Sequence, residues 1–262
     1  MAKTSGTTAF NLDLTELVEE AFERAGSELR TGYDLKTARR SLNIMFADWA
    51  NRGINMWTFE QGTINLVQGL NTYPIPVDTV DLLEHMIRTQ ANQQSNQADL
   101  TITRISVSTY ATIPNKLTQA RPIQVWVQRL DGQVSPTGYT YQSADTGAST
   151  ITLSSTANLP ALGYLNIGTE TIYYGWIVDG TTLGNVFRAQ NGTTQTSPAV
   201  GTAVYVNNLP CVTVWPTPDQ GTVANPYYQF VYWRMRRVQD AGGGVNVMDV
   251  PFRFVSCLTA GL

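Results

Sequence analysis

The chain has 262 residues, of which 42% are hydrophobic and 14% are charged, and its formal net charge is −3. This apolar content is enough for a sizeable core, and so small a share of charge is typical of a subunit whose surface is partly covered in an assembly. An acidic chain neutralises few phosphates, which argues against sequence-specific DNA binding as the main function.

Cysteine usage and hydropathy limit the cell compartment. Cys211 and Cys257 are too few for a disulfide framework, so we expect reduced thiols and synthesis in a cytoplasm. The first residues have no apolar stretch typical of a signal peptide, and no run approaches the roughly 20 residues that span a bilayer. We therefore expect a protein that is not secreted by that route and has no membrane partner.

A first amphipathic helix is predicted over residues 13–25, where apolar residues recur at helical spacing. Asp13 followed by Glu16 forms a capping-box pattern, and Gly26 can end the helix in a left-handed conformation. Four glutamates lie off the apolar stripe and predict an acidic outer face: Glu16, Glu19, Glu20 and Glu23.

A second helix is predicted over residues 34–52, with an apolar stripe that ends in Trp49 and a stop at Gly53. We expect it to pack on the first helix. Its outer residues Lys36, Arg39 and Arg40 have the opposite sign to the glutamates, so helices of this chain or of neighbouring copies can attract one another.

Beyond Gly53 the pattern alternates between apolar and polar residues, which predicts a small antiparallel sheet from residues 57–60 and 63–67. Residues 80–88 fit either a short helix or a strand. A short turn is expected at 106–111 and a strand at 122–130.

Residues 131–209 differ in composition, since they contain no lysine and only five charged residues. Short alternating runs at 150–154, 164–167, 171–176, 182–187 and 203–206 predict an inserted all-β sandwich or barrel. Asp179-Gly180 is a hairpin signal within it. The remaining residues, 1–130 and 210–262, would then form one split domain.

After residue 210 the pattern predicts a long aromatic strand at 227–237, a flexible glycine link at 242–244 and a last helix at 250–262 capped by Asp249. The whole chain is predicted to be α+β. It has an N-terminal helical hairpin, a small antiparallel sheet and a closing C-terminal helix, and the all-β insertion interrupts them.

No constellation of residues predicts catalysis. His85 is the single histidine and lacks partners for a triad or a multi-histidine metal site, so a structural role is favoured. The glycines at 242–244 lack the lysine or spacing of a phosphate loop. We expect no catalytic residue, no cofactor and no metal, and hence no enzyme.

Two surfaces admit alternative interpretations. Arg234, Arg236 and Arg237 could contact DNA without sequence specificity, although a salt-bridged face between subunits is favoured in an acidic chain. Tyrosines and Trp176 in the insertion could stack on sugars, but such residues more often pack. A receptor- or glycan-binding module is therefore the alternative function.

Several strings resemble a known family. ARRSLNIMFADWANRGINMWTFEQGTINLVQGLNTYPIP resembles the N-terminal portion of head-to-tail adaptor proteins of short-tailed phages, also called tail tubular or head completion proteins. YATIPNKLTQARPIQVWVQR, VTVWPTPD, YWRMRRVQD and VPFRFVSCL resemble later segments in the same order. Within the insertion, STITLSSTANLP, GYLNIGTETIYYG and RAQNGTTQTSPAVGTAVY resemble small β modules of phage tail proteins.

This resemblance implies a non-catalytic virion protein at the head-tail interface. It would form a homo-oligomeric ring, typically a dodecamer, joining the portal protein to tail nozzle or fibre proteins, with DNA as non-specific cargo in the channel during ejection. The residues expected to contact portal or neighbouring subunits are Glu16, Glu19, Glu20, Glu23, Arg39, Arg40, Trp49, Arg234, Arg236, Arg237, Phe252 and Phe254.

Overall fold

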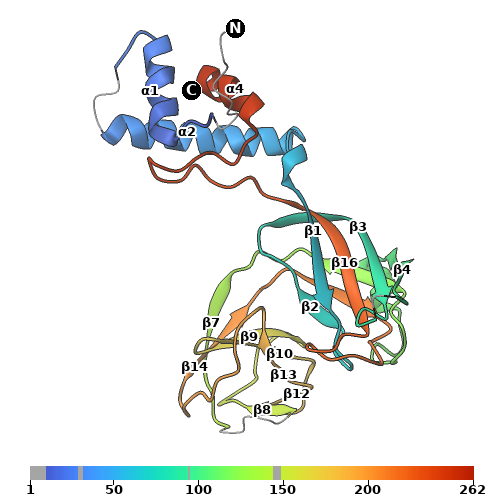
Figure 1. The fold of residues 1–262 in the computed structure, drawn as a ribbon. Helices are drawn as coiled ribbons and strands as arrows, with labels where there is room; N and C mark the ends of the chain where they lie inside the picture. The colour runs from blue at the N-terminus through green and yellow to red at the C-terminus, as the bar shows by residue number, and fades with distance from the viewer. Residues whose placement is uncertain (1–9, 29–31, 94, 144–148) are drawn as a thin grey trace. The chain divides into compact units, whose positions relative to one another are not determined.

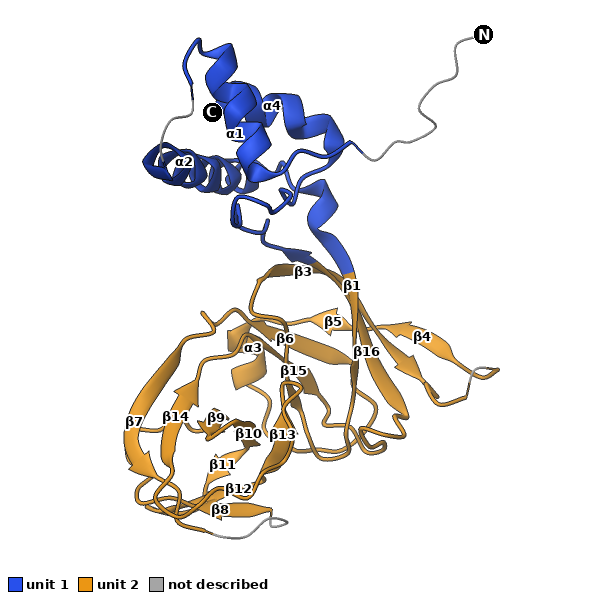
Figure 2. Ribbon diagram, turned by 60° about the vertical axis from the view of Figure 1, so that its left-hand side comes forward, with its two compact units in different colours: residues 1–60, 235–262 blue, residues 61–234 orange. Residues whose placement is uncertain are grey.

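The computed structural model describes residues 10–28, 32–93, 95–143 and 149–262, which divide into two compact units (Figures 1 and 2). Unit 1 comprises residues 1–60 and 235–262, and unit 2 comprises residues 61–234. The chain leaves unit 1 within strand β1 (Phe59–Asn65) and returns within β16 (Tyr228–Arg236). The predicted α+β class is confirmed, with helices at both ends of the chain and antiparallel sheets between them.

Unit 1 is a helical bundle of α1 (Leu14–Arg24), α2 (Gly32–Asn51) and α4 (Val255–Gly261), which lie together in Figure 1. The predicted capping box is present: the Asp13 side chain accepts from the Glu16 N–H at 2.8 Å, and the Glu16 carboxylate accepts from the Asp13 N–H at 3.1 Å. Gly26 has a φ of +72°, which suits a left-handed helix end.

Apolar packing holds these helices together, as the stripes predicted. Leu17 of α1, Leu42 of α2 and Leu258 of α4 are almost fully buried in one cluster. Burial of one such side chain stabilises by roughly 1.5–3 kcal/mol, which is more than the intrinsic propensity of a short helix supplies. The last helix contains a 3-10 turn, η2 (Phe252–Phe254), before α4.

Two predictions about the C-terminal segment are wrong. Asp249 does not cap the last helix, because Pro251 precedes η2 and the Asp249 carboxylate is held by Arg236 instead. The glycines at 242–244 are not a flexible link. The Gly244 carbonyl accepts from the Thr15 backbone N–H at 3.0 Å and from its hydroxyl at 3.1 Å, which fixes this turn on the start of α1.

Unit 2 is built from strands, which form four sheets among the described residues. Their orders are β1-β16-β3-β4, β2-β15-β6-β5, β13-β10-β9-β14-β7 and β11-β12-β8. The bounds, with those of the short helices α3 and η1, are η1 (Met56–Thr58, in unit 1), β2 (Thr72–Pro74), β3 (Thr79–Thr89), β4 (Ala98–Thr101), β5 (Thr103–Arg104), α3 (Val107–Ala111), β6 (Gln124–Gln128), β7 (Val134–Thr140), β8 (Thr150–Thr152), β9 (Gly163–Ile167), β10 (Glu170–Tyr174), β11 (Trp176–Ile177), β12 (Thr182–Gly184), β13 (Phe187–Gln190), β14 (Ala203–Asn207) and β15 (Cys211–Trp215).

Two hydrophobic clusters fill unit 2. One lies within the predicted insertion, around Leu165 and Ile172, while the other joins insertion residues to the flanking strands. Tyr164 belongs to this second cluster and donates through its hydroxyl to the Thr72 carbonyl at 3.0 Å. The insertion thus shares a core with its neighbours, and independent folding between residues 131 and 209 stays a prediction.

Local chemistry explains where strands and helices differ from the sequence pattern. Residues 80–88 lie within strand β3 (Thr79–Thr89), and the segment expected as a turn forms helix α3 (Val107–Ala111), whose start is capped by the Ser106 hydroxyl. Strand β7 was missed because Pro136 and Gly138 interrupt its alternation, which an edge strand tolerates. Across the described residues, no helix is long and apolar enough to cross a membrane.

Candidate functional site

The outer side of α1 carries an acidic face formed by Glu16, Glu19 and Glu23. These side chains recur at helical spacing and are exposed, on the side opposite the buried stripe of the helix. Glu16 also takes part in the capping box, and Glu20 pairs with Arg24 at 2.7 Å. Glu19 and Glu23 form no ion pair within the described parts of the chain, so their charges are open to a partner.

The outer side of α2 carries a basic face formed by Tyr33, Lys36, Arg40, Ile44 and Ala47. All five are exposed, and they recur at three- and four-residue spacing opposite the side that packs on α1. Tyr33 is 74% exposed and Ile44 is 64% exposed, which is unusual for large apolar side chains. Lys36 and Arg40 make no ion pair with any described residue.

Arg39 lies beside this basic face but has an internal role. Its Nε donates to the Ala241 carbonyl at 2.7 Å, and the Ala241 N–H donates to the side chain of Asn43 at 2.7 Å. Both bonds join α2 to the returning C-terminal segment. Of the three basic residues predicted for an outer surface of this helix, Lys36 and Arg40 therefore remain the open ones.

The aromatic candidates divide between the interior and the surface of unit 1. The Trp49 ring lies 5.6 Å from the Phe254 ring, and Trp57 packs on the same phenylalanine at 5.0 Å. Trp49 and Phe254 are thus half-buried packing residues. Phe252 is 60% exposed and meets Phe10 edge to face at 5.9 Å, so it is the phenylalanine that a partner can reach.

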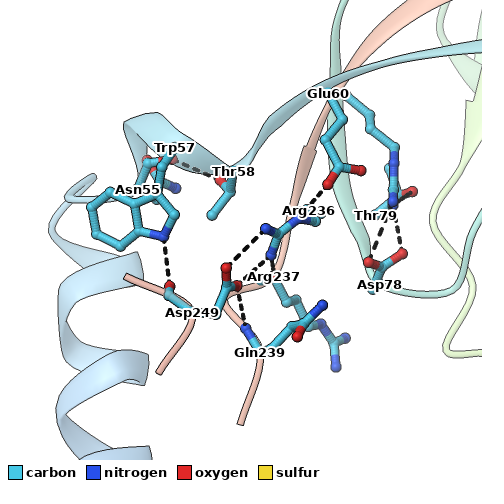
Figure 3. Close-up of polar contacts among 11 residues, drawn as sticks. Asn55, Trp57, Thr58, Glu60, Asp78, Thr79, Arg236, Arg237, Gln239 and Asp249 are labelled. Carbon is cyan, nitrogen blue, oxygen red and sulfur yellow. Dashed lines mark hydrogen bonds and ion pairs between the residues drawn. The ribbon is translucent and has the colours of Figure 1, made fainter. Parts of the chain in front are cut away.

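Arg236 forms a polar clip within unit 1 (Figure 3). Its guanidinium donates from Nε to Glu60 at 2.5 Å and makes two bonds to Asp249, at 2.5 and 3.0 Å. Asp249 also accepts from the Gln239 N–H at 2.9 Å, and its carbonyl accepts from the Trp57 indole at 2.8 Å. The clip joins η1 and the start of β1, the end of β16 and the segment that leads to α4.

Electrostatics strengthens this clip, because only 11% of the Arg236 side chain is exposed. Burial raises the pKa of Asp249, but the bonds from Arg236 and from the Gln239 N–H outweigh it and leave the pKa below its usual value. The pKa of Arg236 is raised by its bonds to Asp249 and Glu60, against the opposing effect of burial. Both groups stay ionised throughout the physiological range.

The other two arginines of the predicted basic cluster, Arg234 and Arg237, differ in burial and in their partners. Arg234 is buried in unit 2, where it pairs with Asp78 at 2.5 Å and donates to the Thr79 hydroxyl at 3.0 Å. Arg237 is exposed, and its carbonyl accepts from Arg236. The structure therefore leaves Arg237 as the outward cation of the three, while the others stabilise their own units.

The ion-pair partners Glu60, Asp78 and Asp249 were missed by sequence reasoning. Glu60 is 176 positions away from Arg236 in the chain, and Asp78 is 156 positions away from Arg234. The one available signal was strand periodicity, because residues 234 and 236 of a strand point to the same side. Periodicity places the arginines together but does not identify the carboxylates that bind them.

The remaining candidates for chemistry are His85 and the side chains that commonly bind metals. His85 on β3 is half-buried near Phe230, and burial, then the Arg104 charge, lowers its pKa. No group of three or more histidine, cysteine, aspartate or glutamate side chains suited to a metal occurs in the described part of the chain. Comparison with protein-family models, curated protein sequences and solved structures finds no match for this chain.

Proposed function

We propose that this protein is a non-catalytic virion structural protein, a head-to-tail adaptor subunit whose ring joins the portal to the tail around the DNA channel. The observation that carries the proposal is the helical unit. It combines open acidic and basic faces with an exposed aromatic end, and these are features of a docking body.

The order of the resembling segments supports the same proposal. The strings at residues 38–76 and 250–258 come from opposite ends of the chain, and residues 38–60 of the first and all of the second belong to unit 1. The Trp49 and Trp57 side chains of the first string meet Phe254 of the second. Two segments that resemble phage adaptors in sequence thus pack together in unit 1.

Charge supports a role beside passing DNA. The chain has a formal net charge of −3, so the subunit as a whole does not carry an excess of cations. A channel wall of this sign repels phosphate weakly across salt solution and does not retain the cargo, whereas a basic wall would bind it. In the proposed ring, DNA is a non-specific cargo and the durable partners are proteins.

Binding of the full chain to DNA-filled heads that carry the portal but no tail tests the proposal. We expect the wild-type chain to sediment with these heads and to form a ring at the portal vertex in particle images. Arg237→Glu with Phe252→Ser should weaken binding, because both side chains are exposed on unit 1. Arg121→Glu with Leu117→Ser, equally exposed on unit 2, is the matched control. Heads that never bind the chain would refute the adaptor role.

A tail-associated receptor- or glycan-binding module is the second candidate, and one observation favours it. Trp176 is 41% exposed and its indole lies against Gly184, where any side chain would collide with it. A flat, exposed tryptophan suits stacking on a sugar ring. Three tyrosines of the insertion, Tyr141, Tyr173 and Tyr174, are buried and cannot stack on a sugar. Glycan-array binding that disappears in Trp176→Ala but survives in Tyr205→Ala would favour this candidate.

A further inference from the structure

The basic face of α2 has the features of a protein-docking surface and lacks an occupant in its own chain. Lys36 and Arg40 flank the exposed apolar groups of Tyr33 and Ile44, and a shallow hollow runs along Arg40, Ile44 and Ala47. Isolated surface ion pairs contribute only about 0.2–1 kcal/mol each, so a stable contact also needs apolar area. This face supplies both.

We propose that the basic face of α2 binds the acidic face of α1 on a second copy of this chain, in a head-to-tail contact. The inference rests on the proposed function, since it names the subunit interface of the adaptor assembly. Charge complementarity identifies the occupant: Glu19 and Glu23 are the open carboxylates on α1, and Lys36 and Arg40 are the open cations on α2.

The two faces cannot satisfy each other within one chain. Each lies opposite the buried stripe of its own helix, and those stripes are packed together through Leu17, Val18 and Leu42. An intrachain pairing would require both helices to turn their apolar sides into water. The charges are therefore available to a neighbouring copy without any rearrangement.

A contact of this kind is heterologous, because different surfaces of the two copies meet. Each pair leaves one acidic face and one basic face open, so further copies can add in the same way. The geometry closes into a ring or continues as a filament. An isologous dimer in which either face meets itself would instead bring like charges together.

Charge reversal in the full chain tests the contact. The variant Lys36→Glu with Arg40→Glu has two acidic faces, and Glu19→Lys with Glu23→Lys has two basic faces. Either variant alone should associate at least about tenfold more weakly than the wild type in sedimentation equilibrium at low salt, which corresponds to about 1.4 kcal/mol. An equimolar mixture of the two variants should recover association, since a chain with two acidic faces can bind a chain with two basic faces. Circular dichroism of each variant verifies that the exposed helices still form.

Matched controls and salt dependence make the result specific. Glu84→Lys with Arg121→Glu reverses exposed charges on unit 2 and should leave self-association unchanged. Wild-type association should weaken as salt rises from about 0.05 M to about 1 M, where the Debye length falls to about 3 Å. Tyr33→Ser should weaken association in both salt conditions, because it removes apolar contact area.

Three results would overturn the inference: a wild-type chain that stays monomeric at low salt, reversed variants that associate like the wild type, or a mixture that does not recover. Failure of the adaptor role is separate, because it appears as absence of binding to portal-bearing heads. Charge-dependent self-association without portal binding would support this interface and refute that role. If the chain binds portal-bearing heads but the charge reversals leave self-association unchanged, the adaptor role is supported and this interface is refuted.

Discussion

The buried ion pair between Glu170 and Arg188 gives a sharp test of how unit 2 is held together. Glu170 is 0% exposed, and its carboxylate accepts from Arg188 Nε at 2.7 Å and from the second guanidinium nitrogen at 2.6 Å. The backbone N–H groups of Ala189 and Thr196 add bonds at 2.9 Å each. These contacts tie β10 to β13 and to the loop that follows it.

Glu170→Gln should lower the free energy of unfolding by about 3–5 kcal/mol, because it leaves the buried guanidinium of Arg188 without a counter-charge. With a urea slope of about 2 kcal/mol per molar, the midpoint falls by roughly 2 M. Arg188→Met should cost less, since the carboxylate keeps the bonds from Ala189 and Thr196. Hydrogen exchange at these two amides should quicken in Glu170→Gln.

The control is a pair with the same chemistry at the surface. Arg88 and Asp99 lie opposite each other on β3 and β4 and form two bonds, at 2.8 and 2.9 Å, but both side chains are substantially exposed. Asp99→Asn should therefore cost less than about 1 kcal/mol. If Glu170→Gln were no more destabilising than Asp99→Asn, burial would not be what makes the inner pair important.

The pH dependence of the same variant has a definite sign. Burial raises the pKa of Glu170. The bonds from Arg188, Thr196 and Ala189 lower this pKa by more than burial raises it, so it lies below the ordinary value of 4.5. The carboxylate therefore stabilises the folded state fully above pH 4.5, and this contribution is lost as pH falls toward the folded-state pKa. The gap between wild type and Glu170→Gln should narrow in acid.

Three further predictions concern single side chains. Arg236→Lys should destabilise unit 1 by about 1–3 kcal/mol in thermal unfolding, because lysine cannot make the paired bonds to Asp249, and an unchanged midpoint would contradict the clip. The fold lowers the pKa of His85, so the free energy of unfolding should fall as pH drops from 7 through the usual pKa of 6.5. In urea titrations at several pH values, His85→Gln should show a weaker dependence of this free energy on pH. Leu42→Ala should cost about 2–5 kcal/mol, against less than about 0.5 for Ile44→Ala on the open side of the same helix; equal effects would refute the assignment of its faces.

The helices and their faces follow from sequence because helical periodicity is a local signal. The stripes containing Leu17 and Leu42, the capping box at Asp13 and the stop at Gly53 each depend on residues within one or two turns. The acidic and basic faces were predicted in the same way, as the remainder of each helix. What α2 does with Arg39 was not predictable, since its acceptor at Ala241 lies 202 positions away.

The misassigned parts involve residues with two good local options. A carboxylate before a helix is a favourable cap, yet the Asp249 carboxylate instead accepts two hydrogen bonds from the Arg236 guanidinium. Three successive glycines suggest a loose link, yet the absence of side chains lets Gly244 approach Thr15 closely. In both cases a distant tertiary contact decides between conformations that the local sequence permits.

The discontinuity of unit 1 has a consequence for synthesis on the ribosome. Leu17 and Leu42 emerge early, but Leu258, which completes their cluster, emerges only after all of unit 2. At about 5–20 residues per second this delay is on the order of ten seconds or more, long enough for a β unit of this size to fold first. The core of the helical unit, which needs Leu258, is then completed after the β unit.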